Sequence, residues 1–229
     1  MSRIKNWWKA WWYNTKNWWT KKDRIATPHL DELPRIKLEK LRLGDIVLFF
    51  DGMWLTEAHG EWMRSVKYGR VTKAPYHTNI VYDKTLTRRH VLVSDTEIVT
   101  NLSLLEHEYC SKKESTIVVI RYPLNQAQNE QMMDHIDKVV AKEPLYGVRR
   151  YAGFLKQIPG FETIGKTVEP KGDSERVCSN RVAYAHFVVG NKVSDLSWRD
   201  TAPVDLLLYK LRNPQRGQMY VLKKKGELL

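Results

Sequence analysis

The sequence predicts an α+β domain in which an antiparallel sheet comes first and helices follow late in the chain. Four short runs are rich in apolar and β-branched residues, and a short polar stretch between the second and third runs is typical of a β-hairpin. Two later segments carry apolar residues at helical spacing. The predicted strands cover residues 46–50, 77–83, 90–95 and 115–123, and the predicted helices cover residues 126–144 and 179–190. With 229 residues, 42% of them hydrophobic, the chain is long enough for one domain with a buried core.

The first half of this domain is defined by turns and apolar runs. Gly44 and Asp45 form a turn that leads into the unbroken apolar run 46–50, which is typical of a buried strand. Residues 101–110 suggest a helical turn between the third and the fourth strand. We therefore expect the sheet to be complete before the first long helix begins.

The two predicted helices have recognisable ends. Apolar residues recur every three or four positions in residues 126–144, and Pro144 ends that helix. The helix over residues 179–190 begins straight after Cys178 and is closed by Gly190, a residue that readily adopts the left-handed conformation found after helices. Both helices are long enough to cover one face of a sheet.

The first 24 residues differ in composition from the rest. They hold seven basic side chains against Asp23 alone and so carry half of the chain's net charge of +12. On a helical wheel, residues 4–19 place six of the nine tryptophans on one side, with lysines beside them. These six are Trp7, Trp8, Trp11, Trp12, Trp18 and Trp19. We read residues 1–24 as an amphipathic helix, residues 25–42 as a linker with two prolines and residues 43–229 as the domain.

A helix with this pattern is suited to an interface. Tryptophan favours sites where an apolar body meets water, and neighbouring lysines can reach lipid phosphates, so the segment fits an anionic membrane surface. The same tryptophans would also suit a protein partner in a larger assembly, or packing onto the protein's own core. Nucleic acid is not an expected partner, because aromatic platforms for bases usually lie on sheets.

Composition excludes several other classes. No run of 18 or more apolar residues predicts a membrane-spanning helix, and lysines and asparagines interrupt the N-terminus where a secretory signal would need an apolar core. Two cysteines, Cys110 and Cys178, are too few for a disulfide scaffold or a structural zinc site. The histidines and acidic residues, including the cluster over residues 106–110, match no metal-ligand spacing. We therefore expect no metal and no cofactor, and a reducing, cytoplasmic compartment, with the protein peripheral on a membrane or carried in a virion.

Cys178 is the strongest candidate for a chemical role. A cysteine at the start of a helix lies near unpaired backbone N–H groups and the positive end of the helix dipole, which lower the pKa of a thiol and can stabilise an oxyanion. The alternative is a small buried apolar residue, which is the more common role of a cysteine. His77 begins a predicted strand, so its ring can project from a strand end toward a helix. Taken alone, it would be an ordinary structural histidine.

Several segments together resemble a known family. LRLGDIVLFF (41–50), HTNIVYD (77–83) and CSNRVAYA (178–185) occur in the order and spacing of the circularly permuted papain-like amidases of the NlpC type, the YiiX-like group. TAPVDLLLY (201–209) resembles the closing segment of that family. The resemblance spans about residues 40–210 and leaves out residues 1–24. It implies a permuted papain-like core with an antiparallel sheet and packed helices.

The resemblance also implies a set of site residues. Cys178 would be the nucleophile and His77 its general base, and the third member should lie at the end of the strand after His77. Asp95 occupies that place, with Ser94 and Glu97 as alternatives in register. Tyr146 stands where the family often has a Tyr-Asp pair, here followed by Gly147, and with Tyr76 it is a candidate for substrate contact.

Two functions follow as hypotheses. The first is a cysteine hydrolase, an amidase, peptidase or acyl hydrolase, which acts through an acyl-thioester on bacterial cell-wall peptides or on acyl lipids. The second is a non-catalytic structural or adaptor protein, for example a phage or virion component, that uses the fold as a scaffold and docks through residues 1–24.

Overall fold

The structure is a computed structural model. It describes the backbone of residues 24–25, 32–51, 70–71, 74–82, 91–95, 100–104, 115–141, 163, 166 and 177–227. Side chains are described for the same residues except 24–25, 70–71, 91–95 and 100–104. The expected tryptophan-rich helix lies outside the described residues.

The described part of the chain is α+β, as the sequence predicts. Its main sheet has the strand order β6-β5-β4-β2-β7-β8, and every neighbouring pair is antiparallel. The strands are β2 (Ile46–Phe50), β4 (His77–Tyr82), β5 (Val91–Asp95), β6 (Thr100–Leu104), β7 (Thr116–Arg121) and β8 (Gln218–Lys223). Side chains are described for four adjacent strands, β4, β2, β7 and β8. Two short strands, β1 (Arg24–Ile25) and β3 (Arg70–Val71), form a separate parallel pair.

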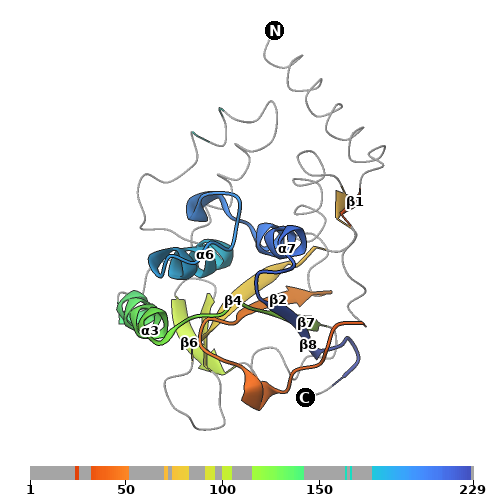
Figure 1. Cartoon of the computed structure of the whole chain (residues 1–229), viewed down its shortest axis with the longest axis horizontal. Coiled ribbons are helices and arrows are strands. Elements are labelled where there is room, and N and C mark those ends of the chain that lie inside the picture. The colour runs from red at the N-terminus through yellow and green to blue at the C-terminus, as the bar shows by residue number, and fades with distance from the viewer. Residues whose placement is uncertain are drawn as a thin grey trace.

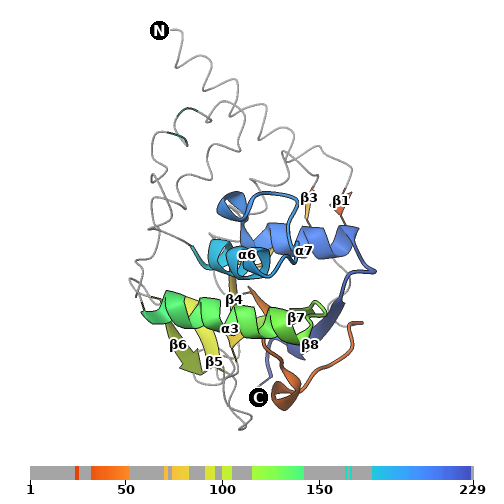
Figure 2. The same cartoon turned by 60° about the vertical axis from the view of Figure 1, so that its left-hand side comes forward.

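Helices cover one face of the main sheet. Figures 1 and 2 show three of them on the same side: α3 (Gln126–Ala141), α6 (Cys178–Val188) and α7 (Pro203–Arg212). Two 3-10 turns accompany them, η1 (Leu38–Lys40) before β2 and η4 (Trp198–Asp200) between α6 and α7. The predicted helices and the hairpin of β4 and β5 are confirmed, with helix ends within a few residues of those expected.

β2 lies at the centre of the domain because both faces of it are covered. Its five residues, Ile46 to Phe50, are all 0% exposed. Ile46, Leu48 and Phe50 pack with the helices in one apolar cluster, whereas Val47 and Phe49 belong to a second cluster on the other face, which Ile36 and Leu41 help to cover. An unbroken apolar run is the pattern expected for a strand buried on both sides.

Two expectations about the sheet are wrong. The sequence suggests a helical turn in residues 101–110. Residues 100–104 instead form strand β6, which pairs with β5 along its whole length. Strand β8 follows α7 and pairs with β7, so the sheet is not complete before the helices begin. Residues 100–104 and strand β8 are both held by hydrogen bonds to a neighbouring strand. The local sequence pattern does not show which segments will pair in this way.

Candidate functional site

Cys178 is the first residue of α6, in the place that the sequence predicts. It is 6% exposed and remains a thiol. The first backbone N–H groups of a helix have no partner within the helix, so the start of α6 can hold an anion. A thiol here is placed to be stabilised as a thiolate.

The start of α6 is anchored by the two residues after Cys178. The Ser179 hydroxyl donates a hydrogen bond to the Thr201 carbonyl oxygen over 2.7 Å. The Asn180 amide donates to the carbonyl oxygens of Thr201 and Trp198 over 3.1 and 3.0 Å. Both side chains are 0% exposed, so these bonds are shielded from water. They fix the first turn of α6, and with it the backbone of Cys178, to the segment around η4.

His77 is the first residue of β4, the strand on which α6 packs. It pairs with Phe49 across β2 and β4, and the centroids of the two rings are 5.5 Å apart. Because Phe49 belongs to the second apolar cluster, the His77 ring packs on the face of the sheet opposite the helices. Burial lowers the pKa of His77 to about 4, although a hydrogen bond to the Asn79 side chain favours the charged form of the ring. The imidazole is therefore neutral at neutral pH.

Tyr76 lies beside this histidine. Its backbone N–H donates to the Phe49 carbonyl oxygen over 2.9 Å, and its ring centroid is 6.4 Å from that of His77. Its hydroxyl oxygen is 3.4 Å from the Ser115 hydroxyl oxygen. Tyr76 and His77 thus form one half-buried aromatic edge at the beginning of β4.

Asp95 is the last residue of β5, the neighbour of β4. The two strands pair Ile80 with Val93 and Val81 with Leu92. The side chains of Ser94 and Asp95 lie outside the described residues.

The remaining predicted site residues lie outside the described part of the chain. They are Tyr146, Glu97, Cys110 and the six N-terminal tryptophans. The described residues contain no group of three or more potential metal ligands. They also contain no helix that is long and apolar enough to cross a membrane.

His186 is a buried histidine that sequence reasoning did not single out. It lies near the end of α6 and is 0% exposed, with its Nδ1 atom 2.9 Å from the Asn191 amide nitrogen and its ring edge-on to Tyr122. Burial lowers its pKa to about 4. A hydrogen bond with the Gly44 backbone opposes this shift of the pKa. In the sequence, His186 is distinguished only by its position within an apolar predicted helix, and that position is typical of a structural residue.

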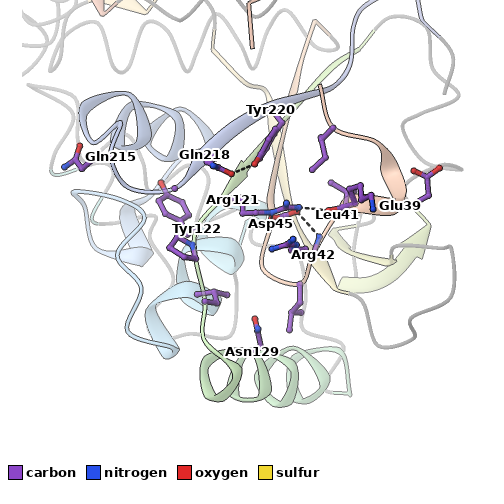
Figure 3. Close-up of a pocket in the computed structure, with 16 residues that line it drawn as sticks. Glu39, Leu41, Arg42, Asp45, Arg121, Tyr122, Asn129, Gln215, Gln218 and Tyr220 are labelled. Atoms are coloured by element: carbon purple, nitrogen blue, oxygen red, sulfur yellow. Dashed lines mark hydrogen bonds and ion pairs between the residues drawn. The ribbon is translucent and has the colours of Figure 1, made fainter. Parts of the chain in front are cut away.

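A polar groove of about 1180 Å³ lies at the other end of β2 (Figure 3). A buried ion pair forms part of its wall: Arg121 donates from Nε to Asp45 Oδ1 over 2.8 Å and from Nη2 to Oδ2 over 2.5 Å. Arg121 also donates to the Lys40 carbonyl oxygen, and the backbone N–H of Arg42 donates to Asp45 Oδ2. Asp45, expected only as a turn residue, thus ties the segment before β2 to the end of β7.

No protein-family model matches the chain, and no curated protein matches it in sequence.

Proposed function

We propose that this protein is a cysteine-dependent hydrolase with a permuted papain-like core of the NlpC type, acting on an amide or an ester. The observation that carries the proposal is the placement of Cys178: it starts α6, and α6 packs on β4, the strand that His77 begins. A nucleophile at a helix start and a base on the adjacent strand are the two parts that the resemblance to YiiX-like amidases requires.

The chemistry follows from these two groups. The thiol of Cys178 loses its proton to the His77 imidazole, and the thiolate attacks the carbonyl carbon of the substrate. Backbone N–H groups at the start of α6 stabilise the oxyanion. The leaving amine or alcohol takes the proton from His77 as the acyl-thioester forms, and water then hydrolyses the thioester with His77 again as base.

For this reaction the His77 imidazole and the Cys178 thiol must come together at the end of the sheet. In the structure the His77 ring packs against Phe49 on the face away from α6. His77 is the first residue of its strand, so the ring reaches the side of α6 if the backbone at this strand end rearranges and the contact with Phe49 is lost. The third member of the triad is Asp95, with Ser94 and Glu97 as alternatives, and Tyr76 and Tyr146 contact the substrate.

Substrate class and location remain part of the same proposal. Cell-wall peptides and acyl lipids are the substrates that the resemblance implies. Residues 1–24 hold the protein on an anionic membrane surface or on a larger assembly, in a reducing, cytoplasmic compartment.

One observation favours a second function. The His77 ring packs between Phe49 and Tyr76, as a structural histidine does. A non-catalytic scaffold or adaptor, such as a phage or virion component that docks through residues 1–24, would need no contact between His77 and Cys178.

Two measurements on the same variants distinguish these functions. Iodoacetamide at neutral pH should label Cys178 much faster than Cys110, because the start of α6 stabilises the thiolate of Cys178. Incubation with p-nitrophenyl acetate should leave an acetyl group on Cys178, visible by mass spectrometry, in the wild type and in the matched control Cys110→Ser, but not in Cys178→Ser. Equal labelling of the two cysteines together with no acetyl adduct would overturn the hydrolase and support the scaffold.

A further inference from the structure

The groove beside Asp45 is separate from the proposed catalytic residues. Asp45 directly precedes β2, whereas Phe49, the partner of His77, lies near the other end of that strand. Four residue steps at about 3.3 Å each place the two positions about 13 Å apart. The groove and the His77 edge therefore lie at opposite ends of the sheet.

The negative charge in the groove is already neutralised. Asp45 is 1% exposed, and both of its carboxylate oxygens accept hydrogen bonds from Arg121. The hydrogen bond to this carboxylate raises the pKa of Arg121, so the guanidinium stays charged, whereas burial raises the pKa of Asp45 against the opposing effect of Arg121. Arg121 is also held from its other side, with its guanidinium carbon 5.5 Å from the centre of the Tyr220 ring. Asp45 and Arg121 are thus held in place by each other and by their neighbours, unlike a pair of mobile charges on the surface.

Four other polar side chains around the groove make no hydrogen bond or ion pair with the described residues, whereas the Tyr220 hydroxyl donates a hydrogen bond to Gln218. Within the part of the chain that the structure describes, the side chains of Lys40 and Arg42 make no hydrogen bond or ion pair, and the same holds for the amides of Asn129 and Gln215. Figure 3 shows Arg42 next to the ion pair of Asp45 and Arg121, with Asn129 on the neighbouring helix. Glu39 is the one lining carboxylate left without a partner, so the unpaired lining groups carry a net positive charge.

Apolar side chains line the rest of the groove. Ile36, Leu41, Leu43 and Leu124 contribute to it, together with Pro123. A groove lined by apolar side chains and a few polar groups is typical of a small-molecule site.

We infer that this groove is a second binding site, for a small molecule with an apolar body and an anionic oxygen group, either carboxylate or phosphate. Arg42 and Lys40 contact the anionic oxygens beside the fixed Arg121, and the amide of Asn129 completes the hydrogen bonds. The site does not involve Cys178, so a test of this binding site is independent of a test of the proposed hydrolase.

Titrations with simple anions test this site. The probes are inorganic phosphate and citrate, added at constant ionic strength against sodium chloride and followed through the NMR signals of the Arg42 backbone N–H and the Arg121 Nε–H. We expect saturable shifts of both signals with at least one probe, and the tighter probe identifies the group as phosphate or carboxylate. The variant Arg42→Gln should weaken that binding about tenfold, because it removes charge-assisted hydrogen bonds.

Further variants separate binding in the groove from general effects of removing a positive charge. Lys40→Gln is a second test with the same expected direction, since the Lys40 side chain has no partner among the residues that the structure describes, whereas Arg42→Gln also removes a charge attraction to Asp45. Arg212→Gln removes a cation from α7 outside the groove and should bind like the wild type, as should Cys178→Ser. The inference is overturned if neither probe shifts the two signals, or if Arg42→Gln and Lys40→Gln bind as tightly as Arg212→Gln.

Discussion

His77 and Phe49 lie opposite each other across β4 and β2, with their ring centroids 5.5 Å apart. This contact places the imidazole against an apolar surface, and burial there lowers its pKa to about 4. A histidine with so low a pKa is neutral at every pH at which the protein would ordinarily work. So low a pKa makes the imidazole a weak acceptor for the proton of a thiol while it lies against Phe49, so the ring must leave this contact to act as a base.

The pH profile of hydrolysis tests the lowered pKa of His77. If His77 is the base and its ring lies against Phe49 in the free enzyme, kcat/KM for p-nitrophenyl acetate should stay level from neutral pH to about pH 5 and fall as the pH approaches about 4, where the ring becomes protonated. His77→Ala should abolish the rate. Circular dichroism at each pH separates this loss from unfolding, and an acid limb near the ordinary histidine pKa of about 6.5 would contradict the placement of the ring.

His186 predicts how stability depends on pH. Its pKa in the folded protein is about 4, whereas an unfolded histidine titrates near 6.5, so the unfolded chain binds a proton between these values that the native protein does not. Stability should therefore be fully present above about pH 6.5 and fall by on the order of 3 kcal/mol as the pH drops to about 4.

Urea unfolding at several pH values measures this loss. His186→Gln should flatten the dependence, and the slope that remains should include the contribution of His77, whose pKa is lowered in the same direction. A slope that His186→Gln leaves unchanged would show that this side chain is not the buried group that titrates.

Gly217 should tolerate no side chain, because two constraints act on it. Its φ of +74° disfavours residues with a Cβ atom, and an added Cβ would lie 2.2 Å from the Arg121 carbonyl oxygen. Backbone cannot move aside as a flexible side chain can, so Gly217→Ala should destabilise the protein by about 3 kcal/mol or more. Gly226 is the matched control: its φ is +91°, but nothing lies within 4 Å of an added Cβ. Gly226→Ala should cost about 1 kcal/mol. Equal urea midpoints for the two variants would contradict the close contact at Gly217.

The tryptophan-rich segment predicts membrane binding. Deleting residues 1–23 spares strand β1 and should abolish co-sedimentation with vesicles that contain an anionic lipid, while circular dichroism of the remaining domain stays the same. Replacing Trp7, Trp11 and Trp18 together by alanine should have the same effect, because it removes part of the apolar side and leaves the charge. Co-sedimentation that survives the deletion would place the membrane contact elsewhere, and binding to neutral vesicles alone would exclude the role of the lysines.

Much of the candidate site could be predicted from local sequence. Cys178 was expected at a helix start because the residues after it have helical spacing, and it starts α6. His77 was expected to begin a strand, and it begins β4. A position within an element depends on neighbours in sequence, so periodicity and turn residues suffice to find it.

The arrangement across the sheet could not be predicted in this way. The ion pair of Asp45 and Arg121 joins residues 76 positions apart, and no periodic pattern links them. The face on which the His77 ring packs depends on the pairing of β4 with β2 and on the side that the helices cover. By itself, then, the sequence determined the α+β class, the central strand and the start of α6, because these follow from local spacing. Only the tertiary structure decided that residues 100–104 form a strand, that β8 closes the sheet and that the His77 ring lies against Phe49, because each depends on a partner that lies far away in the chain.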